Sequence, residues 1–258
     1  DLIMDLRGLA GVPLLIGSAS YEGLVAPDSG VFTWDAHYNS VYFVNSDSPF
    51  ARYDKINLTP FGERMPVISR FPWLEERLLD FGASGMSFAL DESDEAVRFR
   101  LPLRTHGEQE DEISIATPIC FEDTVPWVCR ELVWGDGPGK QALLLVSLSN
   151  DGWFGDSLGG REMHLMAARF RAIENRVPLL RAVNTGVSAL IDSSGRQQET
   201  VPAMTSGSLV AMPRLDRGWT VFAAIGQLAP AIMSIVLLLG IVLSLRGPKE
   251  ESQAEVSS

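Results

Sequence analysis

The chain has 258 residues, of which 33 are acidic and 21 basic, giving a formal net charge of −12. This acidic balance disfavours binding to a nucleic-acid backbone, and two cysteines exclude a disulfide scaffold or a four-cysteine zinc site. The three histidines, His37, His106 and His164, show no metal-ligand spacing. We therefore expect no metal or other cofactor, and we interpret each histidine as a surface residue or an ordinarily hydrogen-bonded one.

The N-terminal part of the chain predicts one helix followed by strands. Apolar residues at helical spacing predict a helix over residues 1–10, which Gly11 and Pro13 end. The apolar run at 12–18 is typical of a strand that is buried on both faces. Two β-rich pieces around a polar turn follow within residues 31–44, and a loop punctuated by proline and glycine comes next.

The second half predicts strands and helices in alternation. Residues 113–119 alternate apolar and polar side chains, and residues 141–148 predict another buried strand. Segment 160–176 carries its apolar residues on one helical face, as an amphipathic helix does. Further strands are predicted at 179–183, 187–191 and 209–212, with a turn at 192–195. Because strands and helices interleave, the predicted fold class is α/β or a layered α+β fold.

Residues 221–245 contain no charged residue, and 19 of these 25 residues are hydrophobic. A helix of this length measures about 37 Å, more than the roughly 30 Å of a bilayer core. We therefore predict one C-terminal transmembrane helix at 219–246, between a globular domain at 1–218 and a polar tail at 247–258. The alternative is a buried core helix. Basic residues flank the segment equally, so charge does not predict its orientation.

Cysteine placement suggests Cys120 as a nucleophile. It ends a strand-like run and precedes the sequence FEDTVP, an exit that would present a side chain at the edge of a sheet. A thiol there can attack an acyl carbon if a base or cation favours the thiolate and donors meet the oxyanion. Cys129 stands among apolar residues of a predicted helix, and we interpret it as a small buried hydrophobic residue.

Three motifs resemble those of the nitrilase (carbon–nitrogen hydrolase) superfamily. The segments 53–66, YDKINLTPFGERMP, and 116–126, ATPICFEDTVP, are similar to its lysine and cysteine motifs. Segment 149–195, which begins SNDGWFGDSLGG, resembles more particularly the apolipoprotein N-acyltransferases within that superfamily. The resemblance extends over about residues 12–215.

This resemblance implies a nitrilase-like αββα sandwich at a bacterial inner membrane, with a Glu–Lys–Cys triad on the periplasmic side. Cys120 would take an acyl chain from a membrane phospholipid as a thioester and pass it to the N-terminal amine of a diacylglyceryl-cysteine apolipoprotein. Lys55 would stabilise the tetrahedral oxyanion. Glu63 and Glu122 fall on motif positions and would support the site, by electrostatics and by hydrogen bonding respectively.

Other residues of the motifs leave two interpretations open. Trp153 and Phe154 either line an acyl pocket or pack beneath it, and Asn150 shapes their loop. Glu63 could instead be a surface carboxylate of a loop. The aromatic stretch at 71–74 either belongs to an arm that covers the site and contacts lipid or forms a small separate core.

One departure from the family pattern concerns the general base. The resemblance predicts a glutamate after a first strand, but here the first glutamate is Glu22, which follows the next strand. We therefore expect an N-terminally shortened chain with little activity alone, because a missing base costs about 10²–10⁴-fold in rate. Two alternatives stay open: a membrane-anchored amidase acting on a small amide, and a non-catalytic nitrilase-like binding module.

Overall fold

The computed structural model describes residues 2–26, 32–45, 50–64, 90–103, 111–137, 139–226 and 228–245. His106 and the aromatic stretch at 71–74 therefore lie outside the described residues. The elements in chain order are α1 (Leu2–Ala10), β1 (Leu14–Glu22), β2 (Ala36–Val44), β3 (Ala51–Asp54), β4 (Phe99–Leu103), β5 (Asp111–Ala116), η2 (Cys120–Thr124), α3 (Pro126–Trp134), β6 (Leu144–Asn150), η3 (Asp151–Phe154), α4 (Leu158–Asn175), β7 (Leu179–Asn184), β8 (Ser188–Ile191), β9 (Gln197–Val201), α5 (Val221–Ile225) and α6 (Leu228–Leu245).

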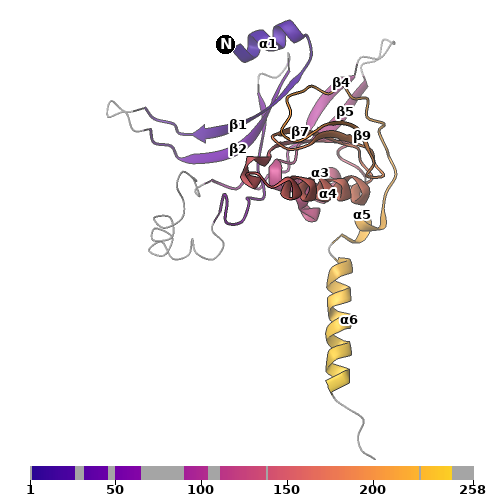
Figure 1. Cartoon of the computed structure of the whole chain (residues 1–258). Helices are drawn as coiled ribbons and strands as arrows, with labels where there is room; N and C mark the ends of the chain where they lie inside the picture. The colour runs from indigo at the N-terminus through magenta and orange to yellow at the C-terminus, as the bar shows by residue number, and fades with distance from the viewer. Residues whose placement is uncertain are drawn as a thin grey trace, which may run out of the picture.

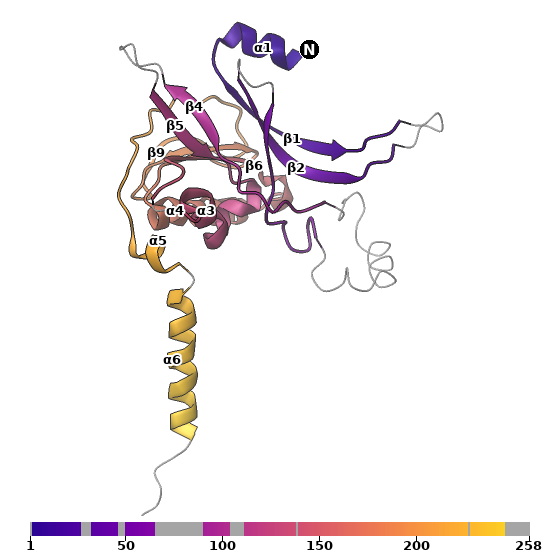
Figure 2. The same ribbon diagram turned by 180° about the vertical axis from the view of Figure 1, so that it is seen from behind.

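Two sheets form the body of the domain (Figure 1). Strands β1, β2 and β3 make an antiparallel sheet in that order, and β4 to β9 make a six-stranded mixed sheet in which β5, β6 and β7 run parallel. Helices α3 and α4 lie along the six-stranded sheet, as both ribbon views show (Figure 2). The predicted α/β class is thus confirmed, and β6 and β7 match the predicted strands closely.

Alternation along β6 and β7 separates the two faces of the larger sheet. Leu148 and Ala182 line a cavity against β1 and β2, whereas Ser147 and Arg181 point to the side of η2 and α4. The described residues thus form three layers: the small sheet, the large sheet and the helices. Helix α1 lies beside the small sheet with exposed apolar side chains, so the outer helical layer of the predicted αββα sandwich is seen in part (Figure 1).

Helix α4 buries the face opposite to the apolar one seen in the sequence. Met163, Met166 and Phe170 are 68%, 51% and 52% exposed. The buried face is largely polar because η2 supplies buried acceptors for it, including the Thr124 carbonyl that accepts from Arg171 at 2.6 Å. The buried residues of α4 are Arg161, His164, Leu165, Ala168, Arg171, Ala172 and Asn175.

The last predicted strand is wrong. Residues 209–212 are described and form no strand, and Val210 and Met212 are 91% and 87% exposed. The chain instead turns at 192–195, where Gly195 has a φ of +80°, and returns as β9 beside β8. Strand β9 lies at the edge of the sheet with mostly exposed polar side chains, so its sequence lacks the apolar alternation that reveals a strand.

Residues 221–245 form two helices rather than one continuous helix. Thr220 caps α5, and Gly226, with a φ of +50°, ends it before α6 begins. Helix α6 leaves the domain alone (Figure 1), is about 27 Å long at 1.5 Å per residue, and has large apolar side chains that are 45–72% exposed. In the part of the chain that the structure describes, no helix combines the length and hydropathy needed to cross a membrane.

The two faces of α4 give opposite predictions for neighbouring residues. Leu165→Ala should lower the free energy of unfolding by about 2–5 kcal/mol, because Leu165 is 2% exposed and its removal leaves a cavity. Met166→Ala, on the exposed face, should change it by less than about 0.5 kcal/mol. Urea unfolding of both variants checks this; a larger loss for Met166→Ala would mean that the apolar face is the packed one.

Candidate active site

Cys120 opens the short helix η2 at the point where the chain leaves the large sheet. Ile119 forms an isolated bridge with Leu148 of β6, and Cys120 follows with a φ of +50°. This left-handed conformation costs a non-glycine residue roughly 1–2 kcal/mol and persists when the surrounding structure fixes it. The turn predicted from the sequence is therefore present, and its neighbours must hold it.

The buried carboxylate of Glu122 fixes this turn. Its Oε2 accepts from the Ile119 N–H at 2.7 Å, and its Oε1 accepts from the N–H groups of Ile56 at 2.8 Å and Asn57 at 3.0 Å. The Tyr53 hydroxyl lies 3.0 Å from both oxygens. Burial raises the pKa of Glu122 to about 7, although the Ile119 N–H opposes this rise. Glu122 thereby ties the cysteine turn to the segment that follows β3.

Lys55 and Glu63 form a largely buried ion pair. The Lys55 side chain is fully buried, and its Nζ donates to Glu63 Oε2 at 2.5 Å and to Thr59 Oγ1 at 3.2 Å. Glu63 also accepts from the Thr59 N–H at 2.7 Å and from Asn39 Nδ2 at 3.1 Å. Burial tends to raise the pKa of Glu63, but the attraction of Lys55 lowers it overall. An ammonium has three donors, and these contacts with described residues use two of them.

Two cavities meet at Cys120. The larger, about 650 Å³, lies between the sheets and is lined by β1, β2, β6 and β7. The smaller, about 460 Å³, lies between the loop after Lys55, η2, η3 and α4. Cys120, Glu63, Asn150 and Trp153 line both cavities. The smaller cavity is the more apolar one, and its walls include Phe61, Phe121, Phe154, Met163 and Ala167.

The loop of η3 forms one wall of these cavities. Asn150 caps η3 by accepting from the Gly152 N–H at 3.1 Å, which agrees with its predicted part in shaping the loop. Trp153 and Phe154 are 58% and 37% exposed and line the smaller cavity rather than packing beneath it. A side chain at position 160 would overlap Phe154, since a Cβ on Gly160 would lie 2.5 Å from its ring.

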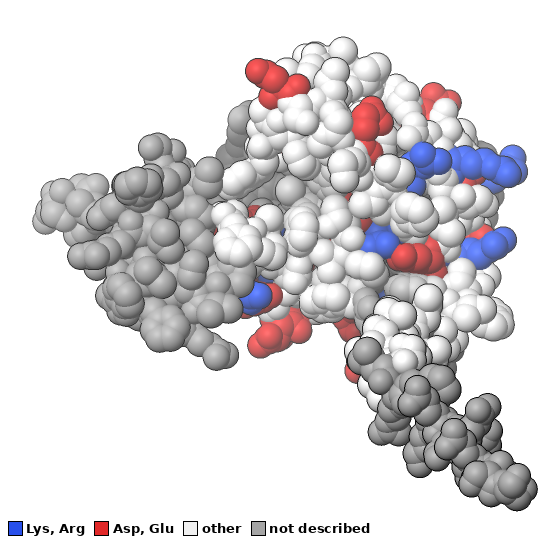
Figure 3. Space-filling model, turned by 60° about the horizontal axis from the view of Figure 1, so that its bottom comes forward, with Lys and Arg blue, Asp and Glu red and all other residues white. Residues whose placement is uncertain are grey.

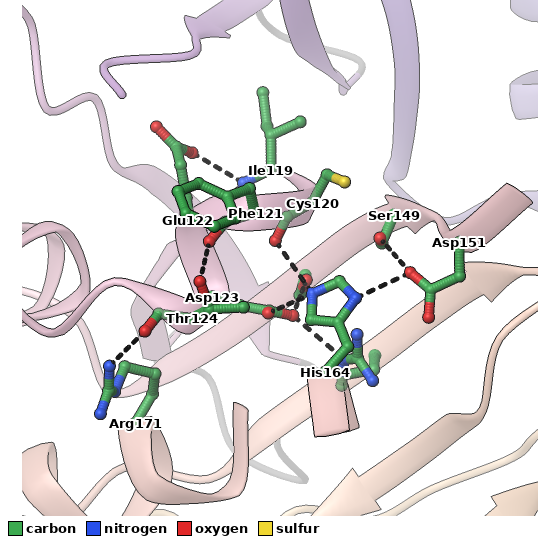
Figure 4. Close-up of polar contacts among 12 residues, drawn as sticks. Ile119, Cys120, Phe121, Glu122, Asp123, Thr124, Ser149, Asp151, His164 and Arg171 are labelled. Atoms are coloured by element: carbon green, nitrogen blue, oxygen red, sulfur yellow. Dashed lines mark hydrogen bonds and ion pairs between the residues drawn. The ribbon is translucent and has the colours of Figure 1, made fainter. Parts of the chain in front are cut away.

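The sequence interpretation missed a cluster of buried charges beneath Cys120 (Figure 4). His164 Nε2 lies 2.7 Å from Asp123 Oδ1, and His164 Nδ1 lies 2.9 Å from Asp151 Oδ1. Asp123 Oδ2 in turn accepts from Ser147 Oγ at 2.7 Å and from Arg181 Nε at 3.0 Å. His164 is thus not a surface histidine: it is buried with both ring nitrogens hydrogen-bonded, as the second interpretation expected, and its partners are two carboxylates. The sequence feature that could have indicated this cluster is the position of His164 on the polar face of the amphipathic helix, a face that such a pattern places toward solvent.

The cluster holds its charges at neutral pH. Burial alone would lower the pKa of His164, but hydrogen bonds to Asp123 and Asp151 raise it to about 10. Burial alone would raise the pKa of Asp123, but Arg181 and His164 lower it to about 2. Among the described side chains, no group of three histidines, cysteines or carboxylates is arranged to hold a metal ion.

The family assignment follows from comparison with known proteins. The carbon–nitrogen hydrolase family profile matches residues 3–219, and the chain therefore belongs to this family, as its motifs predicted. A solved amidase of the nitrilase superfamily from Nesterenkonia overlaps 77% of this chain and 61% of its own at a TM-score of 0.47 and 15% identity.

Curated relatives narrow the resemblance to one branch of the family. A protein from Nitrosomonas europaea is 34% identical over 242 residues, which are 92% of this chain and 42% of the relative. One from Chlorobaculum tepidum is 33% identical over 236 residues, 91% of this chain and 41% of the relative. Both are named apolipoprotein N-acyltransferase. The predicted similarity is confirmed, and the chain spans about two fifths of the length of these relatives.

The charge state of His164 predicts a pH-dependent stability. Its pKa rises from 6.5 to about 10 on folding, so its contribution to stability is complete below pH 6.5 and is lost as pH rises through 10. The free energy of unfolding of wild type minus that of His164→Gln should therefore shrink between about pH 6 and pH 10. Urea unfolding measures it, with the exposed Glu162→Gln as a matched control on the same helix. A difference independent of pH would contradict the assigned charge.

Proposed function

We propose that this chain carries the thiol of a bacterial acyltransferase. It moves a fatty acyl chain from a membrane phospholipid to the N-terminal amine of a diacylglyceryl-cysteine apolipoprotein. The observation that carries this proposal is the position of Cys120 where an apolar cavity meets a second, more polar one, beside the Lys55–Glu63 pair. Similarity to relatives named apolipoprotein N-acyltransferase supports the choice of substrates.

In the first half-reaction Cys120 Sγ bonds to the ester carbonyl carbon of the phospholipid. The ester C–O bond breaks, and the thiol proton ends on the hydroxyl of the departing lysophospholipid. An N–H of Lys55 donates to the tetrahedral oxyanion, an interaction worth roughly 3–4 kcal/mol when it is preorganised. Glu63 holds Lys55 in place, and Glu122 holds the turn that carries the thiol.

The apolar cavity suits the acyl chain of the resulting thioester. Its walls at Phe121, Phe154 and Met163 offer apolar contacts, and each buried methylene contributes about 0.8 kcal/mol. In the second half-reaction the acceptor amine attacks the thioester carbon, an amide bond forms, the C–S bond breaks, and the amine proton returns to the thiol. The larger cavity, which reaches Cys120 from between the sheets, gives the acceptor its approach.

Exposed apolar surface supports a membrane location for this chemistry. Helix α6 is apolar on all sides, and such a helix normally lies within protein or lipid. It leaves the domain on the side where α4 lies (Figure 1), and that side carries both acidic and basic side chains among uncharged ones (Figure 3). We place this face against the bacterial inner membrane with the domain on the periplasmic side. The spanning helix at 219–246 stays a prediction.

The two cysteines give a direct test of the thiol assignment. The complete enzyme, which would include the expected general-base glutamate, is incubated in phospholipid vesicles with a diacylglyceryl-cysteine peptide, and mass spectrometry measures the N-acylated product. Cys120→Ala should abolish the product, whereas Cys129→Ala should leave its rate nearly unchanged, since Cys129 is fully buried in α3 away from both cavities. Equal loss from both changes would refute the assignment. Ammonia release from small amides without peptide acylation would favour an amidase.

Lysine substitution tests the oxyanion role. Lys55→Ala should reduce the acylation rate by about 10²–10³-fold, the usual effect of removing one oxyanion donor. Lys140→Ala is the matched control, because Lys140 donates to the carbonyls of Arg176 and Asp216, whereas Lys55 donates to Glu63, which lines both cavities. Membrane association, measured by flotation with vesicles, should be the same for both. A Lys55→Ala enzyme with an unchanged rate would exclude this role.

A further inference from the structure

We propose that His164 is a positioning residue for Cys120, which joins the thiol-bearing turn to the η3 loop and offsets the carboxylates buried beneath it. This inference rests on the proposed role of Cys120 as the nucleophile. His164 lies within the third motif segment, 149–195, but it is none of the Glu, Lys or Cys residues of the expected triad. Its contacts nevertheless reach both segments that border the thiol.

His164 bridges two segments, η2 and η3, and we call its contacts with Cys120, Asp123 and Asp151 the clamp (Figure 4). His164 Nε2 lies 3.4 Å from the Cys120 carbonyl oxygen as well as 2.7 Å from Asp123 Oδ1, both on η2. On the other side of the ring, Nδ1 lies 2.9 Å from Asp151 Oδ1 on η3. The contact with the carbonyl acts on the residue whose φ is +50°, which needs external restraint.

His164 acts through the backbone and not as the acceptor of the thiol proton. In Figure 4 the Cys120 sulfur points away from the imidazole, while its carbonyl points toward the ring. Both ring nitrogens already face carboxylates, and the raised pKa of His164 keeps the ring protonated at neutral pH. A protonated imidazole whose two N–H groups are engaged has no lone pair to accept a proton.

The charge of His164 balances the cluster. Asp123 from η2 and Asp151 from η3 supply two negative charges, and Arg181 from β7 supplies one positive charge. With His164 protonated the sum is zero, and without it one negative charge remains beneath Cys120. A nearby negative charge disfavours the thiolate, and the thiolate is the reactive form. His164 therefore offsets the carboxylates buried beneath the turn as well as restraining the turn.

The clamp also contacts the apolar cavity. His164, Asp151 and Phe154 all line it, and the rings of Phe154 and His164 have centroids 5.9 Å apart. A chain bound in this cavity therefore touches the same side chains that hold the thiol in place. A role limited to folding stability is the competing explanation, and the experiment must separate the two.

The test is the pH profile of Cys120 alkylation by iodoacetamide, followed by mass spectrometry in a Cys129→Ala background. It is run at a temperature where circular dichroism shows every variant folded. His164→Gln should move the midpoint of the profile upward by about one pH unit, since it leaves an unbalanced negative charge. Asp151→Asn should move it downward, because it keeps the Oδ1 acceptor but removes the charge. The combined variant should return toward wild type.

Opposite shifts that cancel in the combined variant support the proposal, because a loss of stability alone would not produce them. Shifts of the same sign in the two single variants, or no shift in either, would overturn the proposal. The control Glu162→Gln, on the exposed face of α4, should keep the wild-type midpoint. If His164→Gln does not fold, Asp151→Asn decides alone, with no downward shift counting against the proposal. Alkylation needs no phospholipid, so it tests the clamp independently of acyl transfer. If the shifts are found but no acyl transfer is detected, the proposed function is refuted and the positioning role of His164 is still supported.

Discussion

The site depends above all on one buried carboxylate. Glu122 accepts three backbone N–H groups and contacts one phenol, and these donors come from two parts of the chain that are more than 60 residues apart. Without it, the N–H groups of Ile119, Ile56 and Asn57 would lose a buried acceptor, each at a cost of about 1–3 kcal/mol. The same bonds set the Cys120 turn relative to the segment that begins at Lys55, so Glu122 fixes the positions of these two parts of the chain relative to each other.

The Cys120 turn is held from two sides by different chemistry. Glu122 binds backbone N–H groups on the side of the small sheet, and the His164 cluster lies on the side of α4. Between them the sulfur faces a junction of cavities, one largely apolar and one bordered by β1 and β2. A thiol fixed in this way reacts without a further loss of conformational freedom, which is the physical advantage of a preorganised site.

Sequence patterns predicted the elements whose signal is local. The apolar runs predicted β6 and the start of β1, but β1 is not buried on both faces as expected, since Ser20 is the one buried residue of this strand. Cys120, Glu63 and Asn150, which lie in the three motifs, line the same pair of cavities. The pattern failed where tertiary partners decide the outcome. Strand β9 has exposed polar side chains and is specified by pairing with β8, which no local periodicity records.

The buried face of α4 shows the same limit more clearly. Its polar residues are buried because η2 presents carboxylates and carbonyls to them, and its methionines and Phe170 face outward beside the apolar cavity. An amphipathic pattern counts side chains on one helix and contains no information on what the neighbouring element offers. The helical pattern therefore does not reveal that His164 contacts both loops of the site.

The central claim is that Cys120 carries the acyl chain as a thioester. The most direct measurement is peptide mass spectrometry of protein incubated with a phospholipid of known acyl composition in the absence of acceptor peptide. The account predicts one acyl group on the peptide containing Cys120, removed by neutral hydroxylamine, and none on the peptide containing Cys129. An acyl group on another residue would contradict this claim. So would a Cys120 peptide that stays unmodified while the acceptor peptide is acylated in a parallel reaction.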